Sequence, residues 1–147
     1  MHITKDQLEE LEFPELLAEI APFAYSPKTA YKITQLTPFS IDEAEVSLKK
    51  VAEFLSSFES DNAIPFNEYE DIEEELKLMV IENFRLENAA FIRIKSLTEQ
   101  IGRLQKFFPV YGDLFLNLNS DISSLEYRKE IIDKIDKVFN RFGEVKS

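Results

Sequence analysis

Apolar residues recur at alternating spacings of three and four along two long stretches of the chain. The first row consists of Ile41, Ala44, Leu48, Val51, Leu55 and Phe58. The second row consists of Ala90, Ile94, Leu97, Ile101, Leu104 and Phe108. This spacing predicts two long amphipathic helices, over 41–60 and from about Glu87 to Phe108, each with a narrow apolar seam. Because such seams suit packing along another long helix, we expect the two helices to lie side by side.

Helix-start signals precede the remaining elements of the first half. They are the capping pairs Thr4 with Gln7, Ser40 with Glu43 and Asn67 with Glu70, and the proline starts at Pro14 and at Ser26-Pro27. They predict a short first helix, a second helix that Pro22 kinks or ends, a third to about Leu36, and a fifth from Glu68. The second helix should bury Leu16, Leu17, Ile20 and Ala21.

The second half is less regular. Val80–Phe84 interrupts the helical pattern, whereas helix propensity alone would allow the helix to continue. The sequence therefore leaves two alternatives for residues 80–86, a turn or a continued helix. Pro109 should end the second long helix. After it we expect a short apolar helix or turn over 110–118, with Leu114, Phe115 and Leu118 inward, and then a polar connection over 119–124. The last helix should be capped by Asp121 or Ser123 and should end at Gly143. Its buried residues should be Ile131, Ile135, Val138 and Phe142.

These elements add up to one all-α domain over residues 1–147, with about seven helices, two of them long, and no strong strand. The length suits a single domain with one core. The chain has no apolar run near the roughly 18 residues that span a bilayer, and no Cys, which together indicate a cytoplasmic protein. Its net charge of −11 predicts weak or no binding to DNA by the chain itself.

A search for catalytic, cofactor-binding or metal-ligating residues assigns none. The one His is His2, and the three glycines, Gly102, Gly112 and Gly143, are isolated, so a P-loop is excluded. The acids between Glu68 and Glu75 suggest a metal site, but helical di-metal sites also need Glu-x-x-His motifs, which the chain lacks. We therefore interpret this acidic run as a solvated helix start that matches the helix dipole.

Basic residues follow the second long helix and the last helix. They are Lys95, Arg103, Lys106, Arg128, Lys129, Lys134, Lys137 and Arg141. A local positive stripe that touches a phosphate is one interpretation. Surface helices joined by salt bridges are the other, and the acids interleaved with these bases favour it.

A series of short patterns, in order, resembles the N-terminal start of MutS-family proteins, on the branch that lacks the mismatch-reading domain. The patterns are Leu11-Glu12-Phe13 with Leu16-Leu17, Ile20-Ala21 and Ala24; Leu36-Thr37-Pro38 and the stretch from Ala44 to Glu53-Phe54; Ile64-Pro65 with Asp71-Ile72 and Leu76; Arg103 to Phe108; and Val138 to Ser147. The resemblance spans nearly the whole chain. It rests on hydrophobic patterning.

The resemblance implies that this chain is the N-terminal part of the helical core of a DNA-binding ATPase acting in mismatch repair or recombination control. Such a parent would bind ATP and Mg, dimerise through a C-terminal ATPase domain, and in some relatives carry a nuclease domain. This segment would hold no catalytic residue and would transmit motion between ATPase and DNA clamp. The alternative is a stand-alone helical domain that binds a partner helix or protein.

Overall fold

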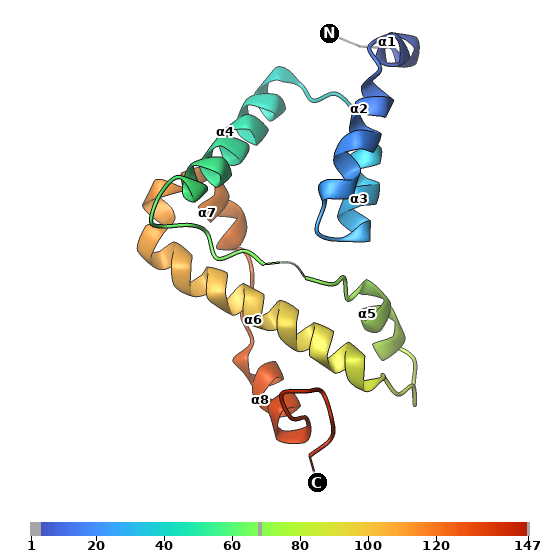
Figure 1. Cartoon of the computed structure of the whole chain (residues 1–147), viewed down its shortest axis with the longest axis vertical. Helices are drawn as coiled ribbons and strands as arrows, with labels where there is room; N and C mark the ends of the chain where they lie inside the picture. The colour runs from blue at the N-terminus through green and yellow to red at the C-terminus, as the bar shows by residue number, and fades with distance from the viewer. Residues whose placement is uncertain (1–3, 68, 147) are drawn as a thin grey trace.

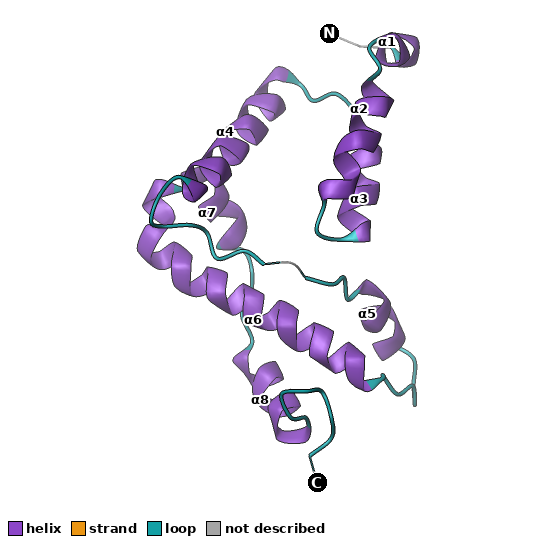
Figure 2. Cartoon of the chain, viewed as in Figure 1, coloured by secondary structure: helices purple, strands orange, loops and turns teal. Residues whose placement is uncertain are grey.

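The structure is a computed structural model that describes residues 4–67 and 69–146 of the chain (Figures 1 and 2). The regular secondary structure of these residues is helical, apart from one isolated β-bridge. The α-helices are α1 Lys5–Glu10, α2 Phe13–Ile20, α3 Pro27–Thr34, α4 Ile41–Phe58, α5 Glu73–Met79, α6 Asn88–Tyr111, α7 Leu116–Ile122 and α8 Lys129–Val138. Two 3-10 helices, η1 Ala21–Phe23 and η2 Gly112–Leu114, complete the set. The predicted all-α class with two long helices is confirmed. His2 lies outside the described residues.

The helix starts of the first half follow the predicted caps. Thr4 and Ser40 each form a full capping box, and the Ser26 hydroxyl accepts a hydrogen bond from the amide of Thr29 at 3.1 Å. Pro14 lies in the first turn of α2, and the chain changes from α to 3-10 geometry at Ala21, just before Pro22. In α2 the predicted inward face is only partly correct, because Leu16 and Ile20 are exposed.

The fifth helix begins later than predicted, at Glu73, where the Asp71 carboxylate accepts a hydrogen bond from the Glu73 amide at 3.0 Å. The predicted cap at Asn67 is therefore wrong, and Glu68 lies outside the described residues. Residues 80–86, which the sequence left open, form a turn in which Asn83 adopts a left-handed φ of 62°. Asn tolerates this conformation better than most residues, which explains the break.

The two long helices do not lie side by side, and this prediction is wrong. α4 meets the C-terminal end of α6 and packs on α7, whereas α6 packs on α8 and α7 (Figure 1). The apolar row of α4 faces solvent, while the row of α6 contributes Ala90, Leu104 and Phe108 to the interior. Matching spacing therefore did not identify the partner of either seam.

α6 continues through Pro109, which was expected to end it. Proline inside a helix costs about 3 kcal/mol through its missing N–H and ring clash. Aromatic packing on both sides of Pro109 offsets this cost: the rings of Phe107 and Tyr111 lie 4.9 Å apart, and Phe108 is buried against Phe115. Tertiary contacts thus override the local signal.

α7 begins within the expected apolar helix or turn over 110–118 and continues through residues 119–122, which were expected to form a polar connection. Glu53 of α4 caps this helix. The Glu53 carboxylate accepts hydrogen bonds from the backbone amides of Asn117 and Leu118, each at 3.0 Å. Burial raises the pKa of Glu53, but these hydrogen bonds outweigh it, and the pKa lies below its ordinary value. A side chain from another helix therefore satisfies the free amides at the start of α7.

Glu53→Ala is expected to lower the free energy of unfolding by about 1 kcal/mol, the usual loss for a helix cap. The two amides of α7 would then lose their acceptor in a half-buried place. Urea unfolding followed by circular dichroism measures the change. Glu45→Ala on the exposed side of the same helix is the control and should stay within about 0.5 kcal/mol of the parent. Equal losses in both variants would contradict the cap.

The C-terminal end differs from the prediction. α8 begins without the expected cap at Asp121 or Ser123 and ends at Val138, and Phe139 then pairs with Val145 in the β-bridge. The turn between them places Gly143 at a φ of +78° and leaves Phe142 exposed. Ile135 and Phe139 are the buried residues here, so the expected burial of Val138 and Phe142 is wrong.

The interior of the protein is small and lies where α4, α6, η2 and α7 meet. Its buried cluster consists of Ile64, Leu104, Phe108 and Phe115. α2 and α3 form a separate hairpin away from this cluster (Figure 1). The accessible surface is 11417 Å², against roughly 7,750 Å² for a compact protein of this mass. The arrangement of helices is therefore open.

Candidate interaction surfaces

The apolar row of α4 is the longest exposed apolar feature of the helices, and we call it the α4 stripe. It consists of Ile41, Ala44, Leu48, Val51, Leu55 and Phe58. Its five large side chains are between 54% and 78% exposed. A second row on α4 consists of Lys50, Phe54 and Ser57, and we call it the opposing row. Each of its residues precedes a residue of the α4 stripe by one position, so the row lies about 100° around the helix from the stripe. That row faces α7 and the interior, where Lys50 pairs with Asp121 at 2.7 Å.

A second exposed apolar surface lies on the hairpin of α2, η1 and α3. Phe23 is 86% exposed, and Leu16, Ile20 and Tyr31 are also exposed. A cavity of about 250 Å³ lies where this hairpin faces the 59–72 segment, lined among others by Phe23, Ile33 and Phe66. The hairpin touches that segment through the rings of Tyr25 and Phe66, 5.3 Å apart, and it touches the start of α5 through an ion pair between Lys28 and Glu73.

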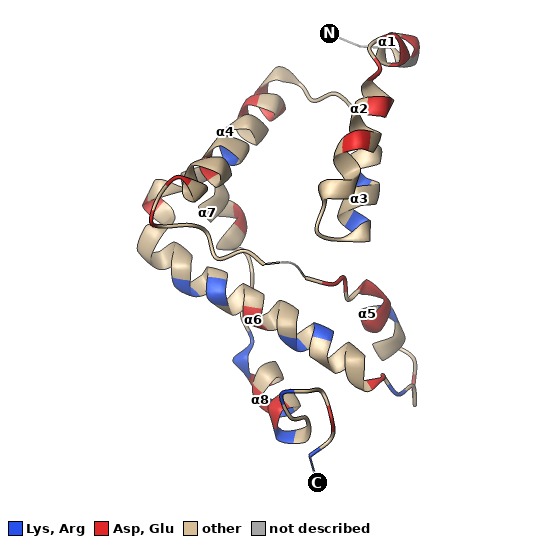
Figure 3. Ribbon diagram, in the orientation of Figure 1, with Lys and Arg blue, Asp and Glu red and all other residues tan. Residues whose placement is uncertain are grey.

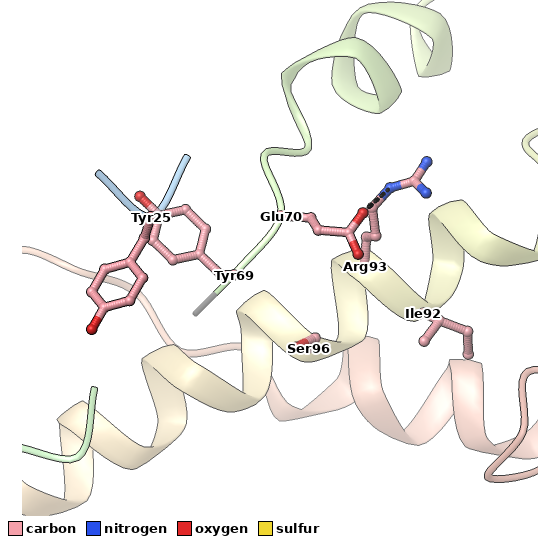
Figure 4. Close-up of a pocket in the computed structure, with 6 residues that line it drawn as sticks. All are labelled: Tyr25, Tyr69, Glu70, Ile92, Arg93 and Ser96. Carbon is pink, nitrogen blue, oxygen red and sulfur yellow. Dashed lines mark ion pairs between the residues drawn. The ribbon is translucent and has the colours of Figure 1, made fainter. Parts of the chain in front are cut away.

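A hollow of about 400 Å³ is lined by Tyr25, Tyr69, Glu70, Ile92, Arg93 and Ser96 (Figure 4). Its only basic group is the Arg93 guanidinium. Arg93 lies 3.8 Å from the Glu70 carboxylate, and its Nε donates a hydrogen bond to Glu75 at 2.8 Å. Two carboxylates therefore already pair with the Arg93 guanidinium, the group that would bind an anionic ligand.

Glu75 is the acid of the 68–75 run that the sequence analysis misjudged. Its side chain is buried rather than solvated, and the Arg93 hydrogen bond lowers the pKa of its carboxyl below the ordinary value. Glu73 pairs with Lys28 and Lys77, and those bonds likewise lower the pKa of Glu73. Among the described residues no group of three or more His, Asp or Glu side chains is arranged to hold a metal ion.

Basic and acidic residues are interleaved along α6 and α8 (Figure 3), and several of the basic residues on or beside these helices have acidic partners. Lys95 pairs with Asp136 at 2.5 Å, and this hydrogen bond raises the pKa of Lys95. Arg128 pairs with Glu126, and Lys129 lies 4.0 Å from Asp133. These pairs neutralise three of the eight basic residues named in the sequence analysis. The geometry favours salt-bridged helices over a phosphate-binding stripe.

The isolated chain is expected to bind duplex DNA weakly at most, because of its net charge of −11 and these ion pairs. Fluorescence anisotropy with a labelled duplex at low and moderate salt measures affinity and salt slope. Each phosphate contact would steepen the slope by roughly one unit. Sub-micromolar binding with a steep slope, weakened by Lys134→Gln or Arg141→Gln, would contradict this expectation.

Sequence reasoning missed two positions that organise these surfaces, Glu53 and Glu75. Each is one acid among many, and its partner lies on another helix, 64 residues away for Asn117 and 18 for Arg93. The only local signal is that Glu53 sits beside Phe54, on the side of α4 away from its apolar row. An acid on that side is a candidate for a contact with another helix.

Within the described part of the chain, no helix is both long and apolar enough to cross a membrane. Comparison of the chain with models of known protein families, with curated proteins and with solved structures gave no match. The candidate function therefore rests on the surfaces described above and on the sequence patterns.

Proposed function

We propose that this chain is a non-catalytic helical segment of a larger MutS-like DNA-binding ATPase, of the branch that lacks the mismatch-reading domain. Its task in mismatch repair or recombination control is mechanical: it transmits movement between the ATPase domain and the DNA clamp. ATP, Mg and DNA are bound by other parts of that protein, which dimerises through its ATPase domain. The observation that carries the proposal is the amount of surface that the chain leaves uncovered.

The size of this surface favours a segment embedded in a larger protein. The accessible area of 11417 Å² exceeds that of a compact protein of equal mass by roughly 3,700 Å². A standard protein interface covers only about 800 Å² on each partner. One partner protein would therefore cover a fraction of the excess, whereas surrounding segments of the same chain would cover most of it.

The location of exposed apolar side chains gives further support. Phe23 and Val80 are 86% and 85% exposed, one at η1 and the other in the turn after α5. Each belongs to an exposed apolar group, Phe23 with Ile20 and Val80 with Met79 and Ile81, and large exposed apolar patches mark interaction sites. Because these side chains lie at separate places in the molecule, several covering segments are needed. The sequence patterns that resemble the MutS family supply the identity of the parent.

The reading frame beyond residue 147 tests the proposal first. It should continue into a chain with a G-x-x-x-x-G-K-[ST] motif, and the purified full-length product should hydrolyse ATP. A stop codon directly after residue 147, or a continuation without that motif, would overturn the proposal. The stop codon would favour the alternative, a stand-alone helical interaction domain.

Hydrogen–deuterium exchange then tests the packing. Amides of residues 13–24 and 80–86 should exchange more slowly in the full-length protein than in the isolated chain, because other segments cover them. The amides around Leu104, already buried in the isolated chain, provide the internal control. Equal exchange of 13–24 and 80–86 in both proteins would show that nothing covers these surfaces.

A further inference from the structure

The α4 stripe has a property that the proposed function does not use: its spacing is the same in both chain directions. Its successive spacings are 3, 4, 3, 4 and 3, so a two-fold axis between residues 49 and 50 maps the stripe onto itself. We propose that the α4 stripe is a self-association surface, on which α4 of a second copy of this chain docks antiparallel.

The antiparallel register pairs large residues with smaller ones along the stripe. Ile41 lies opposite Phe58 of the second copy, Ala44 opposite Leu55, and Leu48 opposite Val51. The two-fold axis generates each of these pairs a second time, so all six stripe residues of each copy take part in the contact. Seams of this spacing pack at a crossing angle of about 20° with helix axes 8–10 Å apart.

The charges beside the stripe are compatible with this pairing. The stripe itself contains no charged residue. In the antiparallel register Glu45 lies level with Phe54 of the second copy, and Glu59 lies level with Ser40, which carries no charge. Lys49 lies level with Lys50 of the second copy, but both residues point away from the stripe, and Lys50 pairs with Asp121 on the other side of the helix. No pair of like charges therefore meets across the contact.

The stripe is accessible to a second helix. α4 lies at an edge of the molecule (Figure 1), and its principal helix contact among the described residues is with α7. That contact uses Lys50 of the opposing row, which pairs with Asp121, and the neighbouring Glu53, which accepts a hydrogen bond from the Asn117 amide at 3.0 Å. Docking on the stripe therefore leaves the existing packing of α4 in place.

The area of the stripe sets the expected affinity. Burial of one large apolar side chain removes roughly 60–120 Å² from water. Five such side chains on each copy give a total of roughly 600–1,200 Å², the lower end of specific interfaces. The dimer should accordingly have a dissociation constant in the micromolar range, and it should rely on this stripe alone.

Analytical ultracentrifugation of the chain over roughly 1–200 µM tests the proposal, a range that brackets interfaces of this size. We expect a monomer–dimer equilibrium, weakened at least about tenfold by Val51→Asp, which buries a charge in the contact. Val46→Asp is the matched control: the same substitution on the same helix, at a side chain of similar exposure, 47% against 54%, on the far side from the stripe. It should leave the equilibrium unchanged.

Cross-linking tests the direction of pairing, because the chain has no cysteine of its own. A mixture of Ile41→Cys and Phe58→Cys chains should form a mixed disulfide on mild oxidation, whereas Ile41→Cys alone should not. A monomer up to the highest concentration would overturn the proposal and leave the stripe to a different protein. Dimers insensitive to Val51→Asp, or an efficient disulfide between two copies of Ile41→Cys, would also overturn it. None of these results depends on the reading frame beyond residue 147.

Discussion

Phe108→Ala is expected to lower the free energy of unfolding by about 3–5 kcal/mol, the usual cost of removing a buried aromatic side chain. Phe108 is 4% exposed and lies in the buried cluster with Ile64, Leu104 and Phe115. This cluster is small, so the rest of the protein offers little to replace the lost contacts. Because a whole domain is stable by roughly 5–15 kcal/mol, this loss is a large fraction of the whole free energy of unfolding.

Urea unfolding followed by far-UV circular dichroism measures this loss, with Phe142→Ala as the control. Phe142 is 71% exposed, and its ring lies 4.6 Å from the Arg141 guanidinium carbon. Its removal should change stability by no more than about 0.5 kcal/mol. Phe108→Leu keeps an apolar side chain in the cluster and should show an intermediate loss. Equal stability of Phe108→Ala and Phe142→Ala would mean that the cluster does not hold the fold.

Helix starts were predictable from the sequence because their signals are local. Ser40 and Glu43 are three residues apart, and the capping box that they form needs no other part of the chain. The same holds for Thr4 and Ser26. The failed cap at Asn67 shows the limit, since the pattern was present but the helix began at Glu73.

Helix ends and partners were not predictable because they depend on distant contacts. Pro109 carries a local signal to stop, yet the rings of Phe107, Phe108 and Tyr111 keep the helix intact around it. The seam of α4 carries a local signal to pack, yet Leu48 is 67% exposed. An apolar seam predicts that a helix face packs against something, but it does not identify the packing partner. Among the elements of this chain that the structure describes, no other one covers the α4 stripe.

The candidate surfaces were also predictable from the sequence only in part. The sequence identified the residues of the α4 stripe, since spacing alone defines them, but assigned them the wrong partner. It did not identify Glu75, because this acid differs from its solvated neighbours by its burial and by its bond to Arg93, and both depend on the fold. Only the fold brings Arg93 to Glu75, across the turn at 80–86.

Glu75→Gln is expected to lower the melting temperature at neutral pH and to flatten its decline in acid. The Arg93 hydrogen bond holds the pKa of Glu75 below the ordinary value of 4.5. A lowered carboxyl pKa stabilises the folded state fully above pH 4.5, and this stabilisation is lost as the pH falls through the lower, folded-state pKa. Glutamine cannot titrate, so the variant lacks this contribution at every pH.

Melting curves of the parent and of Glu75→Gln between neutral and strongly acidic pH measure the effect. Glu74→Gln is the matched control, because the neighbouring Glu74 side chain is 82% exposed and its pair with Lys77 spans 3.4 Å. Surface pairs of this kind contribute little, so the control should follow the parent. Protonation of other acids, Glu53 and Glu73 included, lowers stability in all three proteins alike. The curves of the parent and Glu75→Gln should therefore converge in acid, and a constant gap between them would show that the Glu75 carboxylate is not held by Arg93.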